Sequence, residues 1–360
     1  MTSPLHYATQ GARIFLQGLK NKIKPHRYFG TAEDICKLTV NDCWNGRFFQ
    51  TSTHNFPQFW TRDFGWCTQS LLKLGYEEKI HHTLRYAMNR FKHYHTITTT
   101  ITPGGKPFNF PTAAVDSLPW LIHSIKISHF PYYEHRAFLN QQVQHFFNQF
   151  ISPLTGLVKP DLHVSSMKDF AVRKSSCYDN CMVGMLAADL TELKLENPLE
   201  KYNYPRLITE HFWNGAFFFD DLSKKMYIAG DANIFPFLSG LIRDPVKMAA
   251  ALRALEGAGL TEPFPLKYTA SKQGVSFAWQ ERLMPNYEGN TIWTHMGPLY
   301  IKLLQQVDKE KAALYQERYR QAIAQHGNYI EVFNADGTPY RTPLYSCDRG
   351  MLWAANYLTL

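Results

Sequence analysis

Two carboxylates far apart in the chain have mostly apolar neighbours. Asp116 follows the apolar residues 113–115 in the stretch "PTAAVDSLPWLI", and Glu331 stands between two β-branched residues in "GNYIEVFNADG". An apolar pocket raises the pKa of a carboxyl group, as a general acid requires. Hydrolysis of a glycosidic bond needs such a pair, because one carboxyl protonates the leaving oxygen while the other activates water or attacks carbon. Asp116 and Glu331 are therefore candidates for that chemistry.

Simpler structural roles are open for both residues. Asp116 precedes an apolar helical pattern, and an Asp in that position caps a helix by accepting backbone N–H bonds. Glu331 lies in a short alternating stretch before an Asp-Gly turn, where a carboxylate can face water at a strand edge. Residue types also leave seven other carboxylates open as catalytic groups: Asp63, Asp169, Asp179, Asp220, Asp221, Asp231 and Asp348.

The stretch "FWTRDFGW" places Arg62 and Asp63 among four aromatic residues. A buried charge is costly unless it is paired and hydrogen-bonded, so this pair is either a sheltered salt bridge or part of a polar binding site. Aromatic residues make up 15% of the chain, and several stand beside Asp, Glu, Asn or Gly. That mixture favours a sugar site, in which rings stack on the apolar faces of pyranoses and carboxylates hold the hydroxyls.

Other common catalytic and binding motifs are absent from the sequence. It contains no G-x-S-x-G, Walker, G-x-G-x-x-G or H-E-x-x-H pattern. Cys177 and Cys181 are four apart among six scattered cysteines, but no second His or Cys pair completes a zinc site. The net charge of +8 and the pI of about 9.0 come from dispersed basic residues, without a nucleic-acid-binding motif. We expect no metal, no organic cofactor and no nucleic-acid partner.

Helical periodicity dominates the chain. Apolar residues recur at three- and four-residue spacing, for example at Ile80, Leu84, Ala87, Met88 and Phe91. The pattern predicts helices over residues 6–22, 63–74, 77–95, 114–128, 132–151, 176–194, 205–213, 232–242, 245–257, 291–306, 309–325 and 347–359. The stretches "GAFFFDD" and "KKMYIAG" predict one β-hairpin. About a dozen helices joined by several long polar loops are typical of a single all-α domain whose loops carry the site.

Location is inferred from what the sequence lacks. No apolar run approaches the roughly 18 residues needed to span a bilayer. The first residues contain neither the continuous apolar segment nor the cleavage site of a secretory signal. We therefore expect no membrane partner and a cytoplasmic location, with export by a dedicated route left open.

Five motifs in order resemble the (α/α)6-barrel, or six-hairpin, glycoside hydrolases. They are "WTRDF", "AAVDSLPWLI", "GDANIFPF", "GNTIWTHMGPLYIKLL" and "IEVFNADGTPY…GMLWAANYL", and the likeness covers about residues 50–360. The order and spacing are most similar to neutral/alkaline invertases, the glucosidase domain of glycogen debranching enzymes and processing-type α-glucosidases. The resemblance implies an all-α fold in one domain over residues 1–360, with residues 1–50 as an N-terminal helix and lead-in. About twelve helices would form a toroid, with long loops and a small β-hairpin on one face.

The resemblance also implies roles for single residues. An Asp in a "VDS/VDA…LW" context is the general acid in these families, which carries over to Asp116. A Glu in an "E-aromatic-(D/N)-x-x-G" context is the general base, which carries over to Glu331. Asp348 in "SCDRGMLW" is a rival for the base, because the families have an aromatic-Ser motif at that point. The residues expected to bind the sugar are Trp60, Arg62, Asp63, Asp231, Trp293 and Asp348.

The implied activity is that of an inverting, exo-acting glycoside hydrolase that cleaves an α-glucosyl linkage. Its substrate would be an α-glucan end or an oligosaccharide, as for glucoamylases and α-glucosidases. Its two catalytic carboxyls should stand roughly 6.5–9.5 Å apart, which leaves room for a water molecule. An invertase-like sucrose hydrolase and a non-catalytic carbohydrate-binding protein on the same fold are the alternatives. The sugar, the linkage and the oligomeric state stay open.

Overall fold

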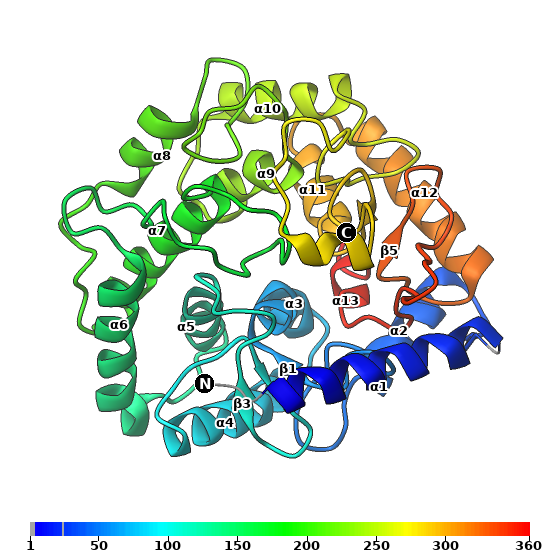
Figure 1. The fold of residues 1–360 in the computed structure, drawn as a ribbon, viewed down its shortest axis with the longest axis horizontal. Helices are drawn as coiled ribbons and strands as arrows, with labels where there is room; N and C mark the ends of the chain where they lie inside the picture. Colours follow the sequence, from blue (N-terminus) through cyan, green and yellow to red (C-terminus); the bar gives the residue numbers. More distant parts are fainter. Residues whose placement is uncertain (1–3, 24) are drawn as a thin grey trace.

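Six helices pack side by side in chain order and close into an inner ring. The structure is a computed structural model that describes residues 4–23 and 25–360. The inner helices are α3 (Thr61–Lys73), α5 (Ser117–Ile127), α7 (Cys177–Glu192), α9 (Gly230–Leu238), α11 (Gly297–Leu304) and α13 (Ala354–Tyr357). Each contacts the next, and α13 packs back against α3 (Figure 1). The predicted toroid is confirmed.

Six further helices surround this ring. They are α2 (Ala32–Asp42), α4 (Glu77–His93), α6 (Arg136–Phe150), α8 (Tyr204–Phe212), α10 (Pro245–Gly257) and α12 (Lys309–His326). Outer helices pack on the inner helix next to them in the chain, as α4 does on α3 and α12 on α11, while α2 packs on α13. Helix α1 (Pro4–Ile23) lies outside both rings, along the lower edge in Figure 1. Two short 3-10 helices, η1 (Tyr133–His135) and η2 (Trp279–Leu283), complete the helical elements of the described residues.

The sequences of the two rings differ as their positions require. In α7, all of residues 177–186 are buried, because an inner helix has neighbours on every side. In α4, the buried positions form one stripe that contains all five of the apolar residues predicted from its periodicity. Within the described ranges, no helix combines the length and apolar composition that crossing a membrane requires.

Two small antiparallel sheets lie among the loops. One contains β1 (Phe59–Trp60), β2 (Thr100–Ile101) and β3 (Pro107–Phe108); the other pairs β4 (Ile292–Trp293) with β5 (Val332–Phe333). In the first sheet Trp60 lies opposite Thr100, and in the second Trp293 lies opposite Val332. The sheets therefore join loops that enter different inner helices.

The predicted hairpin over "GAFFFDD" and "KKMYIAG" is wrong. The two stretches form isolated bridges to other segments instead: Phe218 to Trp213, Asp221 to Ser176 and Ala229 to Thr269. A lone two-stranded hairpin is marginal in water, so tertiary partners outcompete the local pairing.

The helix boundaries differ most from the prediction in three places. Helix α2 lies inside the segment that was expected to be a lead-in, although Thr31 and Asp34 form a capping box at its start. The helix expected over 291–306 begins only at Gly297, because residues 292–293 pair as β4. The helix expected over 347–359 is limited to four residues, Ala354–Tyr357.

The contact between α3 and α5 depends on Gly65. A Cβ added there would lie 2.6 Å from the Cβ of Trp120, too close for real side chains. We expect Gly65→Ala to lower the free energy of unfolding by about 1–3 kcal/mol, because the two helices would have to separate. Urea denaturation should show this, with Gly257→Ala on α10 as the control, since its Cβ meets nothing within 4 Å. A fully stable Gly65→Ala variant would contradict the close approach.

Candidate active site

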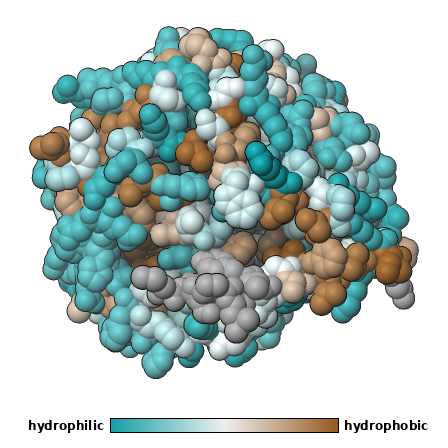
Figure 2. Space-filling model, in the orientation of Figure 1, coloured by the Kyte–Doolittle hydropathy of each residue, from teal (hydrophilic) through white to brown (hydrophobic). Residues whose placement is uncertain are grey.

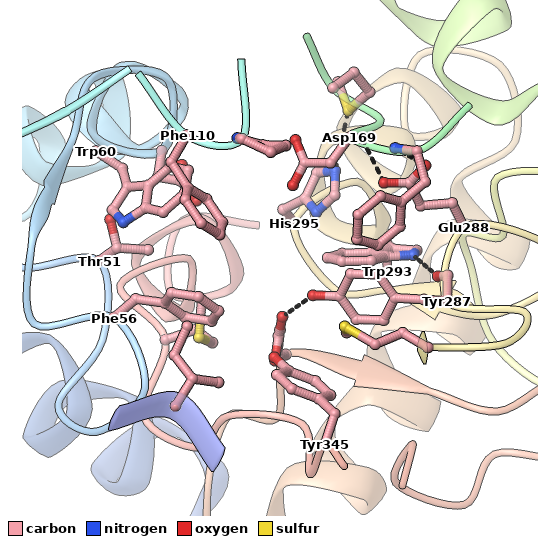
Figure 3. Close-up of a pocket in the computed structure, with 18 of the residues that line it drawn as sticks. Thr51, Phe56, Trp60, Phe110, Asp169, Tyr287, Glu288, Trp293, His295 and Tyr345 are labelled. Carbon is pink, nitrogen blue, oxygen red and sulfur yellow. Dashed lines mark hydrogen bonds between the residues drawn. The ribbon is translucent and has the colours of Figure 1, made fainter. Parts of the chain in front are cut away.

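A cavity of about 620 Å³ lies where loops enter the inner helices. Its charged lining residues are Arg62, Asp63, Asp169, Glu288 and Glu331. Its aromatic lining residues are Phe15, Phe56, Trp60, Trp66, Phe110, Phe170, Tyr268, Tyr287, Trp293, Tyr345 and Trp353, with His295 beside them. Figure 3 shows Trp60, Phe110 and Phe56 facing Asp169, Trp293 and Tyr287 across the open space. Rings and carboxylates thus share one cavity.

Glu331 lies on the cavity wall, immediately before β5. Its carboxylate accepts hydrogen bonds from the hydroxyls of Tyr287 and Tyr345, each at 2.5 Å, and from the backbone N–H of Asp348 at 2.6 Å. The side chain is buried, so the alternative of a strand-edge charge in water is excluded. Burial, reinforced by the charge of Asp348, raises the pKa of Glu331 to about 7.

Asp348 is buried beside Glu331 but does not line the cavity. Its carboxylate accepts hydrogen bonds from the Ser52 hydroxyl and from the backbone N–H groups of Asn55 (2.7 Å) and Arg349 (2.6 Å). Burial raises the pKa of Asp348 to about 6. These contacts join two distant loops and position the Asp348 backbone N–H, which donates to Glu331.

Arg62 and Asp63 stand in the first turn of α3 and both line the cavity. The Asp63 carboxylate accepts a hydrogen bond from the indole N–H of Trp353 at 3.0 Å, and its other oxygen lies 3.9 Å from Arg62 Nε. Burial raises the pKa of Asp63 to about 7 despite the Arg62 charge. The guanidinium of Arg62 also lies over the ring of Trp66, at 5.3 Å.

Asp116 is fully buried at the start of α5 and is not among the residues that line the cavity. It makes no side-chain cap bond to its helix. Its carboxylate accepts hydrogen bonds from the Tyr178 hydroxyl (2.9 Å) and the backbone N–H of Met167 (3.3 Å), and lies 3.5 Å from Arg62 Nη1. Burial raises the pKa of this carboxyl. Asp116 therefore contacts two cavity residues from behind.

Asp231 is also remote from the cavity lining. It stands in the first turn of α9 and pairs with two buried cations, Lys168 at 2.9 Å and Arg173 at 2.8 Å. Both cations also lie within 3.5 Å of Asp220. This buried network fixes the loop around residues 166–173. Trp60 and Trp293, which were also expected to contact the sugar, both line the cavity.

The same loop places Asp169 in the cavity, a residue that the motif comparison did not single out. Asp169 accepts a hydrogen bond from the Ser165 hydroxyl at 2.5 Å, and burial raises its pKa, with the charge of Asp116 adding to the effect. Glu288 lies behind it and accepts hydrogen bonds from the backbone N–H groups of residues 169–171. Burial and the Asp169 charge raise the pKa of Glu288 to about 8. The length of the loop "HVSSMKDFAVRKSS" was the available sequence signal.

Several buried polar atoms at the cavity have no hydrogen-bond partner among the described residues. They are Trp60 Nε1, Arg62 Nε, Asp63 Oδ2, Trp66 Nε1, Gln280 Oε1 and His295 Nδ1. His295 stacks on Trp66 with 4.4 Å between ring centroids, and burial holds its pKa well below the usual range, so the ring is neutral. Buried polar groups are nearly always satisfied in native proteins, by protein, water or ligand. Water or a hydroxyl-bearing ligand in the cavity would satisfy these atoms.

Comparison with known proteins identifies the fold. No protein-family model and no curated protein sequence matches the chain. A rhamnosidase from Klebsiella oxytoca with rhamnose bound is similar in structure, with 11% identity and a TM-score of 0.65 over 91% of this chain and 62% of its own. A GH78 family rhamnosidase of Bacillus sp. GL1 is 13% identical, with a TM-score of 0.60 over 91% of this chain and 34% of its own. A GH63 mannosylglycerate hydrolase from Thermus thermophilus, in complex with glucose, is 11% identical, with a TM-score of 0.57 over 91% and 98%.

The chain thus spans less than two thirds of the length of either rhamnosidase, but nearly all of the mannosylglycerate hydrolase. At identities this low, the likeness shows the fold alone. It confirms the predicted (α/α)6 barrel.

Proposed function

We propose that this protein is a glycoside hydrolase whose cavity holds the terminal sugar of its substrate. The observation that carries this proposal is the set of unpartnered buried polar atoms, which lies among aromatic rings and carboxylates in one cavity. Pyranose hydroxyls would supply the missing hydrogen bonds, and the rings would cover the apolar faces of the sugar. Structural neighbours that carry rhamnose or glucose support a sugar as the ligand.

Within this proposal, the general acid is Asp169 rather than Asp116. A general acid must reach the glycosidic oxygen directly or through one water. Asp169 lines the cavity, and burial raises its pKa in the direction that a general acid requires. Asp116 is a positioning residue in this scheme, because its carboxylate holds Arg62 and the backbone at Met167.

The general base is Glu331. It takes a proton from a water whose oxygen bonds to the anomeric carbon, while Asp169 gives its proton to the glycosidic oxygen as the C–O bond breaks. The products are the free sugar with inverted configuration and the leaving alcohol. The hydroxyls of Tyr287 and Tyr345 donate to Glu331 and so orient its carboxylate toward that water.

An α-glucosyl group is the favoured donor, on the strength of the motif resemblance. Cleavage at a chain end fits a cavity whose inner wall is closed by nearly inaccessible side chains such as His295 and Trp353. The named neighbours extend the range of donors to be tested to mannosyl and rhamnosyl groups.

A substrate panel tests the proposal. Purified protein is incubated with maltose, glycogen, sucrose, and α-glucosides, α-mannosides and α-rhamnosides, and free sugar is quantified. We expect release from at least one α-linked donor, with the inverted anomer appearing first in proton NMR spectra. Release from sucrose alone would favour the invertase-like alternative, and tight sugar binding without release would favour a carbohydrate-binding protein. If none of these compounds is bound or hydrolysed, the proposal is refuted.

The pH dependence of turnover should show an acidic limb near neutrality. Glu331 must be ionised to act as base, and its pKa is about 7, so kcat/KM should fall about tenfold for each pH unit below that value. Initial rates between pH 5 and 9 measure this limb, with circular dichroism as the control for folding. A rate that keeps rising down to pH 5 would contradict the role of Glu331.

Asp63 should matter for turnover more than for stability. We expect Asp63→Ala to lower kcat/KM by about 100-fold or more, because a buried acceptor for a sugar hydroxyl is lost. The melting temperature should fall only slightly, because Arg62 keeps its closer carboxylate partner, Asp116 at 3.5 Å. Activity that persists while the melting temperature falls sharply would identify a purely structural ion pair with Arg62.

A further inference from the structure

The outer part of the cavity has a different character from its inner end. We call it the apolar mouth; it is lined by Ile14, Phe15, Phe56, Leu283, Met284 and Leu344. Phe15, Leu283 and Leu344 are 37%, 49% and 51% exposed, whereas Glu331 and His295 at the inner end are 1% exposed. Hydrophobic side chains also gather over α1 at the lower right of Figure 2. Large apolar side chains therefore surround the entrance.

The apolar mouth is assembled from four segments: helix α1, the loop before β1, the segment around η2 and the loop before α13. Three hydrogen bonds join neighbours among them: Arg13 Nη2 to the Asn55 carbonyl (2.7 Å), Lys22 Nζ to the Thr342 carbonyl (2.7 Å) and the Tyr340 hydroxyl to the Pro285 carbonyl (2.9 Å). These bonds connect the four segments at the opening.

Charge is divided sharply between the two ends. All five charged residues of the lining belong to the groups around Arg62, Asp169 and Glu331, and the six residues of the apolar mouth include none. A second sugar at this exposed mouth would keep its hydroxyls in water and gain few direct hydrogen bonds from the aliphatic side chains there. An alkyl or aryl group there would instead gain from leaving water.

We propose that the apolar mouth binds the leaving group of the substrate, and that this group is an alkyl or aryl aglycone rather than another sugar. The inference rests on the proposed function, because a leaving group bound to a sugar at the inner end must extend past Asp169 toward the opening. Its shape follows from the lining: Phe15 and Phe56 offer ring contacts, while Leu283, Met284 and Leu344 offer flexible aliphatic ones.

Paired alkyl glycosides test the proposal. Methyl and hexyl α-D-glucopyranosides, α-D-mannopyranosides and α-L-rhamnopyranosides carry leaving alcohols of similar basicity, so differences between them report binding at the mouth. We expect kcat/KM for the hexyl compound to exceed that for the methyl compound by about tenfold or more, since burial of two methylene groups alone corresponds to about 15-fold. Maltose should be a poorer substrate than hexyl α-D-glucopyranoside. Equal rates for the two alkyl glycosides, or a preference for maltose, would overturn the proposal.

Substitutions in the apolar mouth localise the effect. Leu283→Ser and Leu344→Ser should each lower the hexyl-to-methyl ratio of kcat/KM several-fold. Leu314→Ser is the matched control, because this leucine is 48% exposed on α12 and does not line the cavity. A ratio unchanged by both mouth variants would overturn the assignment of the aglycone to this surface. The assignment would also be overturned if light scattering showed a change of oligomeric state in either variant, because the surface would then bind a second copy of the chain.

A binding measurement separates this proposal from the proposed function. Calorimetry with Glu331→Gln compares the dissociation constants of the hexyl and methyl glycosides without turnover. Tighter hexyl binding that depends on Leu344, together with no hydrolysis by wild type, would refute the hydrolase and leave the apolar mouth in place. Hydrolysis of both compounds with equal dissociation constants would refute the apolar mouth and leave the hydrolase in place. If neither compound binds, both the hydrolase and the apolar mouth are refuted.

Discussion

Replacing Glu331 by Gln should lower kcat by about 10²–10⁴-fold, because the water would lose its general base. Stability should respond in the opposite direction. The pKa of Glu331 in the folded protein, about 7, lies above its ordinary value, so its contribution to stability is present at low pH and is lost as pH rises through about 7. A glutamine cannot ionise and avoids that loss. At pH 8 the melting temperature of Glu331→Gln should therefore equal or exceed that of the wild type.

Two comparisons make this experiment specific. Glu210→Gln on α8 is the control, since Glu210 is exposed and pairs with Arg206 on the surface. Asp348→Asn tests the rival base. Because Asp348 accepts three hydrogen bonds from neighbouring loops and does not line the cavity, we expect Asp348→Asn to reduce stability more than Glu331→Gln does. An inactive, fully stable Asp348→Asn variant beside an active Glu331→Gln variant would transfer the role of base to Asp348.

Asp169→Asn should lower kcat by about 10²–10⁴-fold for glycosides with alkyl leaving groups. The loss should be much smaller for 4-nitrophenyl glycosides of the same donor, because a nitrophenolate leaves without a proton. This dependence on the leaving group is the signature of a missing general acid, and a residue that only supports the fold would not produce it. Rates on both substrate types, measured at one pH, provide the test. Asp161→Asn is the control, because Asp161 is exposed in the segment that precedes the loop.

Asp116→Asn distinguishes the two candidates for the acid. We expect it to reduce activity toward alkyl and 4-nitrophenyl glycosides by similar factors, because Asp116 acts through Arg62 and Met167. It should also reduce stability, since it would leave the buried guanidinium of Arg62 with one fewer carboxylate. If instead 4-nitrophenyl glycosides rescue Asp116→Asn and not Asp169→Asn, the general acid is Asp116.

Much of the fold could be predicted from the sequence because helical periodicity is a local signal. Residues 80–91 show one apolar stripe, and the same positions are buried on α4. The predicted hairpin around residues 215–230 failed for a related reason: Asp221 and Ala229 pair with Ser176 and Thr269, which are distant in the chain. Short strands and helix ends depend on such distant partners, which no local window contains.

The candidate site was predicted in part. Trp60, Arg62, Asp63, Trp293 and Glu331 all line the cavity, and the aromatic neighbours of Asp63 were a fair sign of it. The other expected contacts, Asp116, Asp231 and Asp348, are buried behind the lining and hold loops in place. The sequence cannot distinguish a carboxylate that lines the cavity from one buried behind it. Burial raises the pKa of the carboxyl group in both positions.

The sequence by itself determined the succession of amphipathic helices and a list of nine candidate carboxylates. Only the tertiary structure decided which carboxylates meet. Asp169 and Glu331 reach one cavity because α13 closes the ring against α3 and because a buried network around Asp231 turns the loop of residues 166–173 inward. Periodicity reports whether a side chain faces water or protein. It cannot report which distant segment faces it, because that depends on the packing free energy of the whole ring.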